Sequence, residues 1–261
     1  MSKICNLFSG SSGNCVYIEN NDTAVLVDAG VSAKRITQAL LQRDIDVSKI
    51  KAIFVTHEHI DHASGVRVFS TKNKIPVFAT AGTFKGMEEK GFLSEKVDAN
   101  VLEEETDIKN IGVKHFATSH DTYESCGYTF DLGNQKIAVC TDLGVITDEV
   151  DNAISGSSAV VLESNHDIKM LQNNSKYSFM LKRRILSERG HLSNTACASQ
   201  AVKLIESGTK RIVLAHLSQE NNLPFLASET TQSLLKMGGM KNGEDYLLSV
   251  AAPEDNDIII L

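Results

Sequence analysis

One short stretch of the chain concentrates side chains that bind metals. Between residues 56 and 62 there are three histidines and an aspartate, namely His57, His59, Asp61 and His62. Clustered imidazole and carboxylate groups are costly to remove from water unless a cation lies among them. They are also ligands that suit zinc, manganese and iron. The stretch therefore predicts a metal site rather than a polar loop that happens to be rich in histidine.

The neighbouring residues indicate how these ligands converge. The stretch follows the apolar run 52–55, typical of a buried strand, and precedes residues 63–66, where a helix can start. In extended chain, residues two apart project to the same side, so His57 and His59 can face one point. The helical zinc-peptidase motif His-Glu-x-x-His does not apply, because Asp61 stands where its second histidine would be.

Three further candidate ligands lie at the ends of predicted strands. They are His120, Asp142 and His216, which end or follow the strand-like runs 113–119, 137–141 and 212–215. A lone histidine after a strand is more often an ordinary surface residue. Three such residues, added to the four of the turn, predict one site where loops from several strands meet.

Composition limits the class of protein. The chain has 261 residues, of which 42% are hydrophobic and 23% charged, as in soluble globular proteins. It contains no apolar run of about 18 residues that could span a membrane and no secretory hydrophobic region. Five cysteines without a Cys-x-x-Cys pair predict reduced thiols and a cytoplasmic location. The net charge of −7 disfavours a broad nucleic-acid-binding face but leaves room for a local basic patch.

Strand and helix patterns alternate along the chain, with no linker rich in proline or glycine. Strands are expected at 4–8, 15–19, 24–27, 75–79, 111–117, 128–132, 137–140, 159–162 and 211–215, and helices after Gly30, at 84–90 and around 198–205. The strand-rich and helical parts occur twice in the same order. This predicts two similar halves, each a sheet covered by helices.

Taken together, these motifs resemble the metallo-β-lactamase fold superfamily over nearly the whole chain. The resemblance implies an α/β protein of four layers (αβ/βα), with two mixed sheets covered by helices, in a single domain of residues 1–261 without an inserted domain. It also implies two divalent metal ions, zinc or manganese, with iron as an alternative. His57, His59 and His120 would hold one ion, Asp61, His62 and His216 the other, and Asp142 would bridge them.

The same resemblance gives a role to Asp28, in the stretch Leu26–Gly30. It would accept a hydrogen bond from a ligand histidine and so orient it. From the residues alone, a buried carboxylate that caps the following helix is an equal alternative.

The spacing of the motifs separates the branches of the superfamily. The β-lactamases carry a cysteine where Asp142 stands, and Cys140 is expected to be a small core residue. Flavodiiron oxygen reductases carry a glutamate in place of His59. Only 74 positions separate Asp142 from His216, too few for the domain inserted in RNA-processing members. The 22 positions from His120 to Asp142 are too few for the arm of tRNA 3′-processing enzymes.

Three stretches resemble the YycJ/WalJ branch, whose members are associated with 5′-exonuclease action on DNA. They are Ser9–Asn14, Glu163–Asp167 and Gly190–Asn194, in the same order relative to the metal motifs. The resemblance implies a nuclease or phosphodiesterase rather than an amidase, and most specifically a 5′-to-3′ DNA exonuclease.

The first stretch is a candidate phosphate-binding loop. Its hydroxyls, amide and backbone N–H groups can meet a phosphate, and its glycines allow close approach. A tight hairpin turn is the alternative. Candidate substrate contacts in it are Ser9, Ser11, Ser12 and Asn14, and elsewhere Asn165, His166, Asn194, Lys182 and Arg184.

Several of these residues also have an ordinary structural interpretation. His166 is either a substrate contact or a surface residue satisfied by its surroundings. Lys182 and Arg184 belong to the one dense basic run, 176–189, which either guides a nucleic-acid strand or is a solvated helix face. His191 precedes a helix whose N-cap is Ser193 or Asn194. It could donate a proton to a leaving oxygen or be a solvated loop residue.

The hypothesis that unites these predictions is two-metal hydrolysis of a phosphodiester, with Asp61 accepting the proton of the nucleophile and His191 protonating the departing 3′ oxygen. The expected partner is nucleic acid, DNA in preference to RNA, with no membrane and with a homo-oligomer left open. Two alternatives stay open. One is a metallo-hydrolase of a cyclic phosphodiester, thioester or lactone, and the other is a non-catalytic regulatory protein that binds metal.

Overall fold

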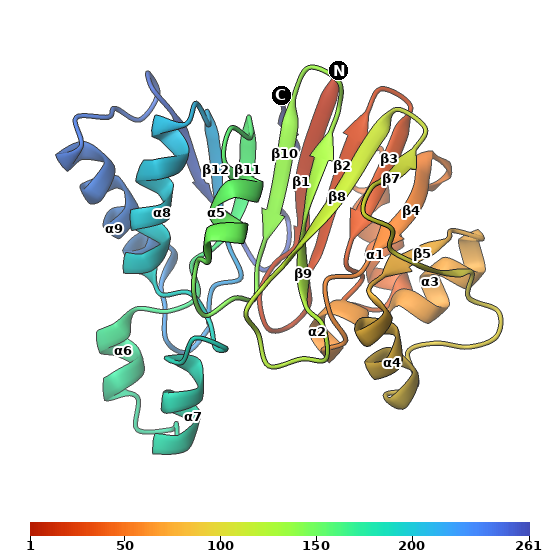
Figure 1. Ribbon diagram of the computed structural model, residues 1–261, viewed down its shortest axis with the longest axis horizontal. Helices are drawn as coiled ribbons and strands as arrows, with labels where there is room; N and C mark the ends of the chain where they lie inside the picture. Colours follow the sequence, from red (N-terminus) through yellow and green to blue (C-terminus); the bar gives the residue numbers. More distant parts are fainter. The chain divides into compact units, whose positions relative to one another are not determined.

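The computed structural model describes residues 1–261 and divides into two compact units (Figure 1). The first comprises Met1–His115, Thr122–Asn134 and Ala252–Leu261. The second comprises Phe116–Asp121 and Gln135–Ala251. Each unit has its own cluster of buried apolar side chains. The predicted organisation as one domain with two similar halves is not tested by this division and stays a prediction.

The first unit contains a mixed sheet in the order β14-β1-β2-β3-β4-β5-β6. Its strands are β1 (Ser2–Phe8), β2 (Cys15–Asn20), β3 (Thr23–Val27), β4 (Ile50–Phe54), β5 (Val77–Ala79), β6 (Ala99–Val101) and β14 (Ile259–Ile260). Pairing is antiparallel from β14 to β3 and parallel from β3 to β6. Further strands are β7 (Thr106–Ile108), β8 (Ile111–Ala117) and β9 (Cys126–Asp131).

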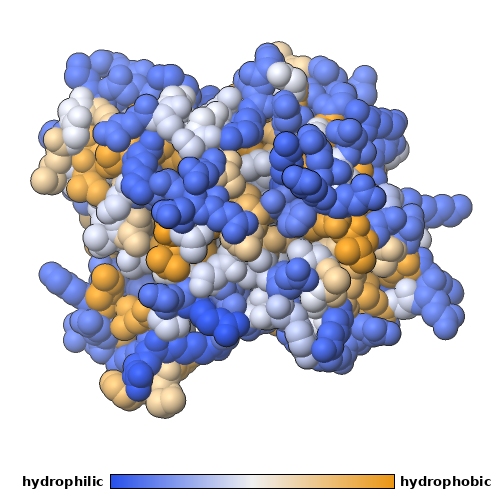
Figure 2. Space-filling view, viewed as in Figure 1, coloured by the Kyte–Doolittle hydropathy of each residue, from blue (hydrophilic) through white to orange (hydrophobic).

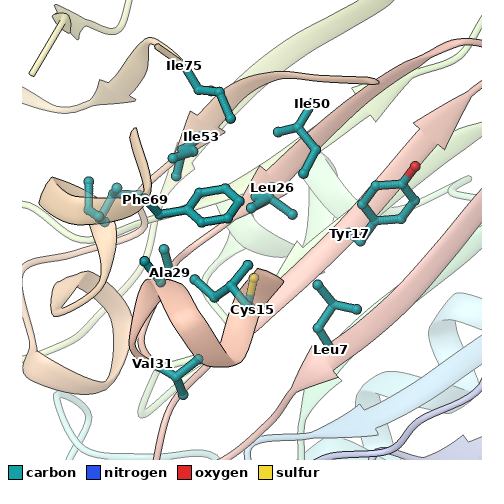
Figure 3. Packing of buried hydrophobic residues seen from close by; sticks show 14 of the residues in the cluster. Leu7, Cys15, Tyr17, Leu26, Ala29, Val31, Ile50, Ile53, Phe69 and Ile75 are labelled. Atoms are coloured by element: carbon teal, nitrogen blue, oxygen red, sulfur yellow. The ribbon is translucent and has the colours of Figure 1, made fainter. Parts of the chain in front are cut away.

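The helices of the first unit cover this sheet. They are α1 (Ala33–Leu41), α2 (Ile60–Ala63), α3 (Val66–Asn73) and α4 (Ala81–Glu89), with a short 3₁₀ turn η1 (Val47–Lys49). Helix α1 begins where the Ser32 side chain accepts the Arg35 N–H. Figure 3 shows Phe69 of α3 pointing toward Leu26 of β3, with Ile53 of β4 beside it, and all three are fully buried. Truncating such a phenylalanine to alanine costs about 3–5 kcal/mol.

The second unit contains a parallel array in the order β13-β12-β11-β10. Its strands are β10 (Lys136–Cys140), β11 (Ala159–Glu163), β12 (Arg211–Ala215) and β13 (Leu247–Val250). Its helices are α5 (Asp148–Ile154), α6 (Ile168–Asn173), α7 (Phe179–Ile185), α8 (Asn194–Glu206) and α9 (Pro224–Met237). Helices α8 and α9 pack against each other (Figure 1). Because the strands are parallel, their carboxyl ends share one edge, and Asp142, Glu163 and His216 lie at or just after those ends.

The predicted strands are found with small shifts at their ends. Every strand expected from the sequence is present, and so are the helices after Gly30, at 81–89 and at 194–206. The short strands β6, β7, β13 and β14 and the helices α5, α6, α7 and α9 were not predicted. All five cysteines are free and buried, including Cys140 as expected. None of the helices combines the length and apolar character needed to cross a membrane.

Candidate metal centre

The histidine-rich turn of the first unit leaves β4 and enters α2. His57 and His62 are fully buried and His59 is half-buried. Nε2 of His57 lies 3.0 Å from Nδ1 of His59. The spacing of two residues therefore brings these imidazoles to one point, as expected from the sequence.

Asp28, directly after β3, fixes the orientation of His62. Its Oδ2 lies 2.7 Å from His62 Nδ1 and its Oδ1 accepts the Thr56 N–H at 2.8 Å. Since an ionised carboxylate can only accept, Nδ1 carries the proton, and the lone pair of the neutral ring is on Nε2. Burial raises the pKa of Asp28, although His62 and Thr56 partly oppose that rise. Ser32, not Asp28, caps the N-terminus of helix α1, so the alternative role of Asp28 as a helix cap does not apply.

The loop Ser9–Asn14 packs against the same turn. Asn14 donates its backbone N–H to the Asp61 carbonyl at 2.8 Å, and its side-chain amide lies 3.0 Å from His62 Nε2. The amide oxygen of Asn14 also accepts the Gly10 N–H at 2.9 Å. Ser9 is buried, whereas Ser11 and Ser12 are exposed. The loop thus forms a tight turn on which Ser11 and Ser12 present accessible hydroxyls.

In the second unit, four side chains able to bind a metal lie close together. The ligating atoms of Asp142, Glu163, His191 and His216 all lie within 4.8 Å of one another. Glu163 Oε1 lies 2.9 Å from His191 Nδ1 and 2.8 Å from His216 Nδ1. Glu163 Oε2 accepts the backbone N–H groups of Leu143 and Leu192 at 3.1 and 2.9 Å. One fully buried carboxylate therefore positions two histidines and two loops.

The electrostatics of this cluster favour an ionised Glu163. Burial acts to raise its pKa, but His191 and the hydrogen bonds from both histidines outweigh burial and lower the pKa to about 2. In turn, burial acts to lower the pKa of His191, and the Glu163 carboxylate reverses this and raises it. His191 therefore tends to stay protonated, and its Nδ1 faces Glu163.

His120 is positioned by a backbone carbonyl of the same unit. Its Nδ1 lies 3.0 Å from the Gly190 carbonyl, and its Nε2 lies 3.8 Å from Asp142 Oδ1. A Cβ on Gly190 would meet the Ile185 carbonyl oxygen at 2.1 Å, so only glycine fits there. The segment before His191 therefore also orients His120.

Three residues of the candidate site share a strained backbone. Asp28, Asp142 and His216 follow strand ends and have φ of 63°, 59° and 56°. Residues other than glycine seldom adopt this left-handed conformation, which costs about 1–3 kcal/mol per residue. The same strain at three strand ends, on three residues able to bind metal or orient a ligand, points to a functional constraint.

Two predicted substrate contacts, Asn165 and Asn194, have structural hydrogen bonds. Asn165 and Asn194 are buried, at 7% and 2% exposure. The Asn165 amide donates to the His216 carbonyl at 2.9 Å. The Asn194 amide oxygen accepts the Ser164 hydroxyl at 2.7 Å, and its nitrogen donates to Asn222 at 2.9 Å. Both side chains are used to hold the loops of the second unit, and we assign them that role.

The remaining predicted contacts have varied environments. His166 is buried at 1% exposure, so the alternative of a surface residue is wrong. Its two ring nitrogens have no hydrogen-bond partner, and burial lowers its pKa to about 4. Lys182 donates to the Gln172 carbonyl at 2.7 Å, and Arg184 forms an ion pair with Asp121. Both cations therefore also join parts of the protein to one another.

Two glutamates of the site, Glu163 and Glu58, were not predicted to have a role of their own. Glu163 directly follows the apolar run 159–162, so the strand-end rule that selected Asp142 and His216 would have found it. Glu58, inside the histidine turn, is buried and accepts the Tyr123 N–H at 3.1 Å. No sequence signal indicated that contact.

The donor set of these clusters suits divalent metal ions. The candidate ligands offer imidazole nitrogens and carboxylate oxygens, the donors typical of zinc, manganese and iron sites. In His62, His120 and His216, Nδ1 faces a carboxylate or a carbonyl, which fixes the tautomer whose Nε2 can bind a metal. Burial raises the pKa of the nearby Cys140 thiol, which argues against a thiolate ligand.

Comparison with known proteins defines the class to which this fold and site belong. Residues 9–216 match the Metallo-beta-lactamase superfamily, and the chain belongs to that superfamily. Among solved structures, it resembles the metallo-beta-lactamase fold protein YhfI from Bacillus subtilis, with a TM-score of 0.72 and 12% identity over 98% of this chain and 99% of that one. Human tRNase Z, short form, gives a TM-score of 0.66 and 16% identity over 100% and 99% of the two chains. The predicted α/β fold of two mixed sheets with helices is confirmed.

Curated relatives narrow the class to one branch. The chain is 36% identical over 251 residues to exodeoxyribonuclease YycJ of Bacillus anthracis, covering 95% of this chain and 94% of that protein. It is 34% identical over 253 residues to exodeoxyribonuclease WalJ of Streptococcus pneumoniae, covering 95% and 93%. The chain belongs to the YycJ/WalJ branch, as its motifs predicted.

Proposed function

We propose that this protein is a metal-dependent 5′-to-3′ exonuclease of DNA. The observation that carries the proposal is the similarity, over 95% of the chain, to relatives that are named exodeoxyribonucleases. The imidazoles of the histidine turn in the first unit and the cluster of imidazoles and carboxylates in the second support it, because such side chains bind the metals of hydrolases.

The proposal includes two divalent ions, zinc or manganese, with iron as an alternative. His57, His59 and His120 would hold one ion, and Asp61, His62 and His216 the other, with Asp142 shared between them. When bound, such ions lower the pKa of water and neutralise charge on a phosphodiester. The orientation of His62 by Asp28, and of His216 by Glu163, supports these assignments.

The protein's own residues would carry the protons. As water attacks phosphorus, Asp61 accepts its proton and the bond from phosphorus to the 3′ oxygen breaks. His191 donates a proton to that oxygen from Nε2. The raised pKa of His191 and the hold of Glu163 on its Nδ1 support this role.

The terminal phosphate would be held by the loop Ser9–Asn14. Its Ser11 and Ser12 hydroxyls are exposed, and the positive φ of Gly10 and Gly13, 117° and 144°, allows the tight turn that presents them. Binding of the 5′ phosphate by this loop would make the enzyme prefer strands with a phosphorylated 5′ end. We place the reaction in the cytoplasm, on the strength of the free thiols.

The test is a digestion with metal-loaded protein. Strands of one sequence are prepared as DNA and as RNA, with 5′-phosphate or 5′-hydroxyl ends, and as a single-stranded circle. Mononucleotides released from the 5′ end of linear DNA are expected, with the circle left intact. Internal cuts in the circle would contradict an exonuclease. Turnover confined to cyclic phosphodiesters, thioesters or lactones would favour another hydrolase, and full metal content without any turnover would favour a regulatory protein.

A further inference from the structure

Helix α7 of the second unit has an unusual surface. None of its seven residues is buried, although it starts with two large apolar side chains. Phe179 and Met180 are 73% and 70% exposed. Figure 2 shows apolar surface at the lower left, over α7. Single exposed apolar residues are common, but an exposed aromatic beside a second large apolar side chain is a candidate contact surface.

The segment around this helix is rich in basic residues, two of which, Lys176 and Arg184, pair with Glu220 and Asp121. The segment 168–189 contains six basic residues and one acidic residue, in a chain whose net charge is −7. The basic residues are Lys169, Lys176, Lys182, Arg183, Arg184 and Arg189. Arg183 and Lys169 are exposed and form no ion pair, so their charges face solvent. A concentration of positive charge in an acidic protein favours a polyanion as the partner.

The apolar and basic side chains share one face. Phe179 and Arg183 are four residues apart on α7, and the Arg183 guanidinium lies 5.8 Å from the centre of the Phe179 ring. Met180 is three residues before Arg183 and adjoins the same face. The helix therefore presents an aromatic plane and a guanidinium plane together.

Helix α7 is connected by hydrogen bonds to the segment that carries the candidate acid, His191. The His191 N–H bonds to the Ile185 carbonyl at 3.0 Å, at the end of α7. Arg189 donates to the His120 carbonyl at 3.2 and 3.3 Å. A rise of about 1.5 Å per residue places Phe179 about 9 Å along the helix from Ile185. A strand whose scissile bond lies at His191 would thus pass the α7 face within a few nucleotides.

We infer that Phe179, Met180 and Arg183 form a platform on which bases of single-stranded DNA stack, a few nucleotides beyond the cleaved bond. The inference rests on the proposed function and adds the feature that holds the strand. Aromatic rings and guanidinium planes stack on any base, so the platform suits an enzyme that digests all sequences. Lys169, which is exposed on the same segment, would meet the phosphates. Bases that stack and phosphates that carry negative charge together match the aromatic ring and the basic side chains of this face.

The test measures binding separately from turnover. Metal-loaded wild-type protein, Phe179→Ala and Phe225→Ala are titrated with a fluorescent phosphorothioate single strand that resists hydrolysis. Phe225 is the matched control, because it is 69% exposed on α9 and lies outside the basic segment. We expect Phe179→Ala to raise Kd about fivefold or more, the lower range for loss of a base–aromatic stack, and Phe225→Ala to leave it within about twofold.

An abasic scan identifies stacking as the cause. One base at a time is removed along the strand. Wild-type protein should lose affinity when the missing base lies over the platform, and Phe179→Ala should lose nothing more at that position. An unchanged Kd for Phe179→Ala, in protein that binds and digests DNA normally, would overturn the platform but not the proposed exonuclease function. Wild-type protein that neither binds nor digests DNA would overturn the proposed function as well. A wild-type dimer that Phe179→Ala converts to monomers would make the face an interface between two copies and overturn the platform.

Discussion

Asp28 in the first unit and Glu163 in the second are both buried carboxylates that hold histidines by Nδ1, yet their pKa values shift in opposite directions. Asp28 is contacted by one imidazole and by Thr56, and burial prevails, so its pKa is raised. Glu163 is buried as deeply, but two imidazoles and two backbone N–H groups contact it, and its pKa is lowered to about 2. The charge of His191 and the hydrogen bonds from two imidazoles, not a shallower burial, make Glu163 the firmer anion.

The difference also concerns what each carboxylate supports. Asp28 orients one candidate ligand, His62. Glu163 orients a candidate ligand, His216, and the candidate acid, His191, with one oxygen atom. Loss of Glu163 should therefore disturb metal binding and proton donation together, whereas loss of Asp28 should disturb metal binding alone.

The largest effect is expected from Glu163→Gln. Disorienting the acid should lower kcat by about 10²- to 10⁴-fold, and weakening His216 as a ligand should reduce metal affinity by about tenfold or more. Steady-state kinetics and metal titration measure the two losses. The amide can still accept the Leu143 and Leu192 N–H groups, so the fold should persist, with a circular dichroism spectrum like that of wild type. A loss confined to metal affinity would mean that Glu163 does not act on His191.

Replacement of His191 separates the two roles of Glu163. His191→Ala should lower kcat by about 10²- to 10⁴-fold because no group protonates the 3′ oxygen, while metal content stays intact. A p-nitrophenyl phosphodiester, whose leaving group needs no proton, should recover most of that loss. Equal damage on both substrates would show that His191 positions the substrate, and the acid would have to be another residue.

A smaller effect is expected from Asp28→Asn. Residues that orient metal ligands typically contribute about 10- to 100-fold to metal affinity or activity. We expect a loss in that range, with metal affinity reduced and most of kcat recovered at saturating metal. Damage to kcat as severe as that of Glu163→Gln, at saturating metal, would remove the distinction between the two carboxylates.

The smallest effect is on stability in acid, measured on metal-free protein by urea unfolding. The folded-state pKa of Glu163 is lowered, so its contribution is present above its unfolded pKa of about 4.3 and fades as pH falls toward 2. The folded-state pKa of Asp28 is raised, so protonation favours the folded protein and its contribution improves as pH falls. Between pH 5 and 3, the stability advantage of wild type over Glu163→Gln should shrink and that over Asp28→Asn should grow. Parallel trends for both variants would contradict the opposite shifts.

Much of the fold and of the metal motif could be predicted from the sequence, for identifiable reasons. Apolar runs such as 52–55 and 159–162 must be buried strands, and the period of two in His57-x-His59 sets the side that both face. The left-handed backbone at Asp28, Asp142 and His216 left no trace in composition. Helix α7 has no buried face, so its hydrophobic pattern carried no period to detect. The hydrogen bonds of Glu163 join residues up to 53 positions apart, and only the fold brings these together.

We propose that the chain holds two metal ions on nitrogen and oxygen ligands, with Asp142 shared and Glu163 acting only through its histidines. Anomalous diffraction from crystals of the metal-loaded protein, at the absorption edge of the added zinc or manganese, tests this directly. We expect two peaks per chain, about 3.5–4 Å apart, both bonded to Asp142 and neither to Glu163. A single peak, or a peak bonded to Glu163 while Asp142 is turned away, would contradict the proposal.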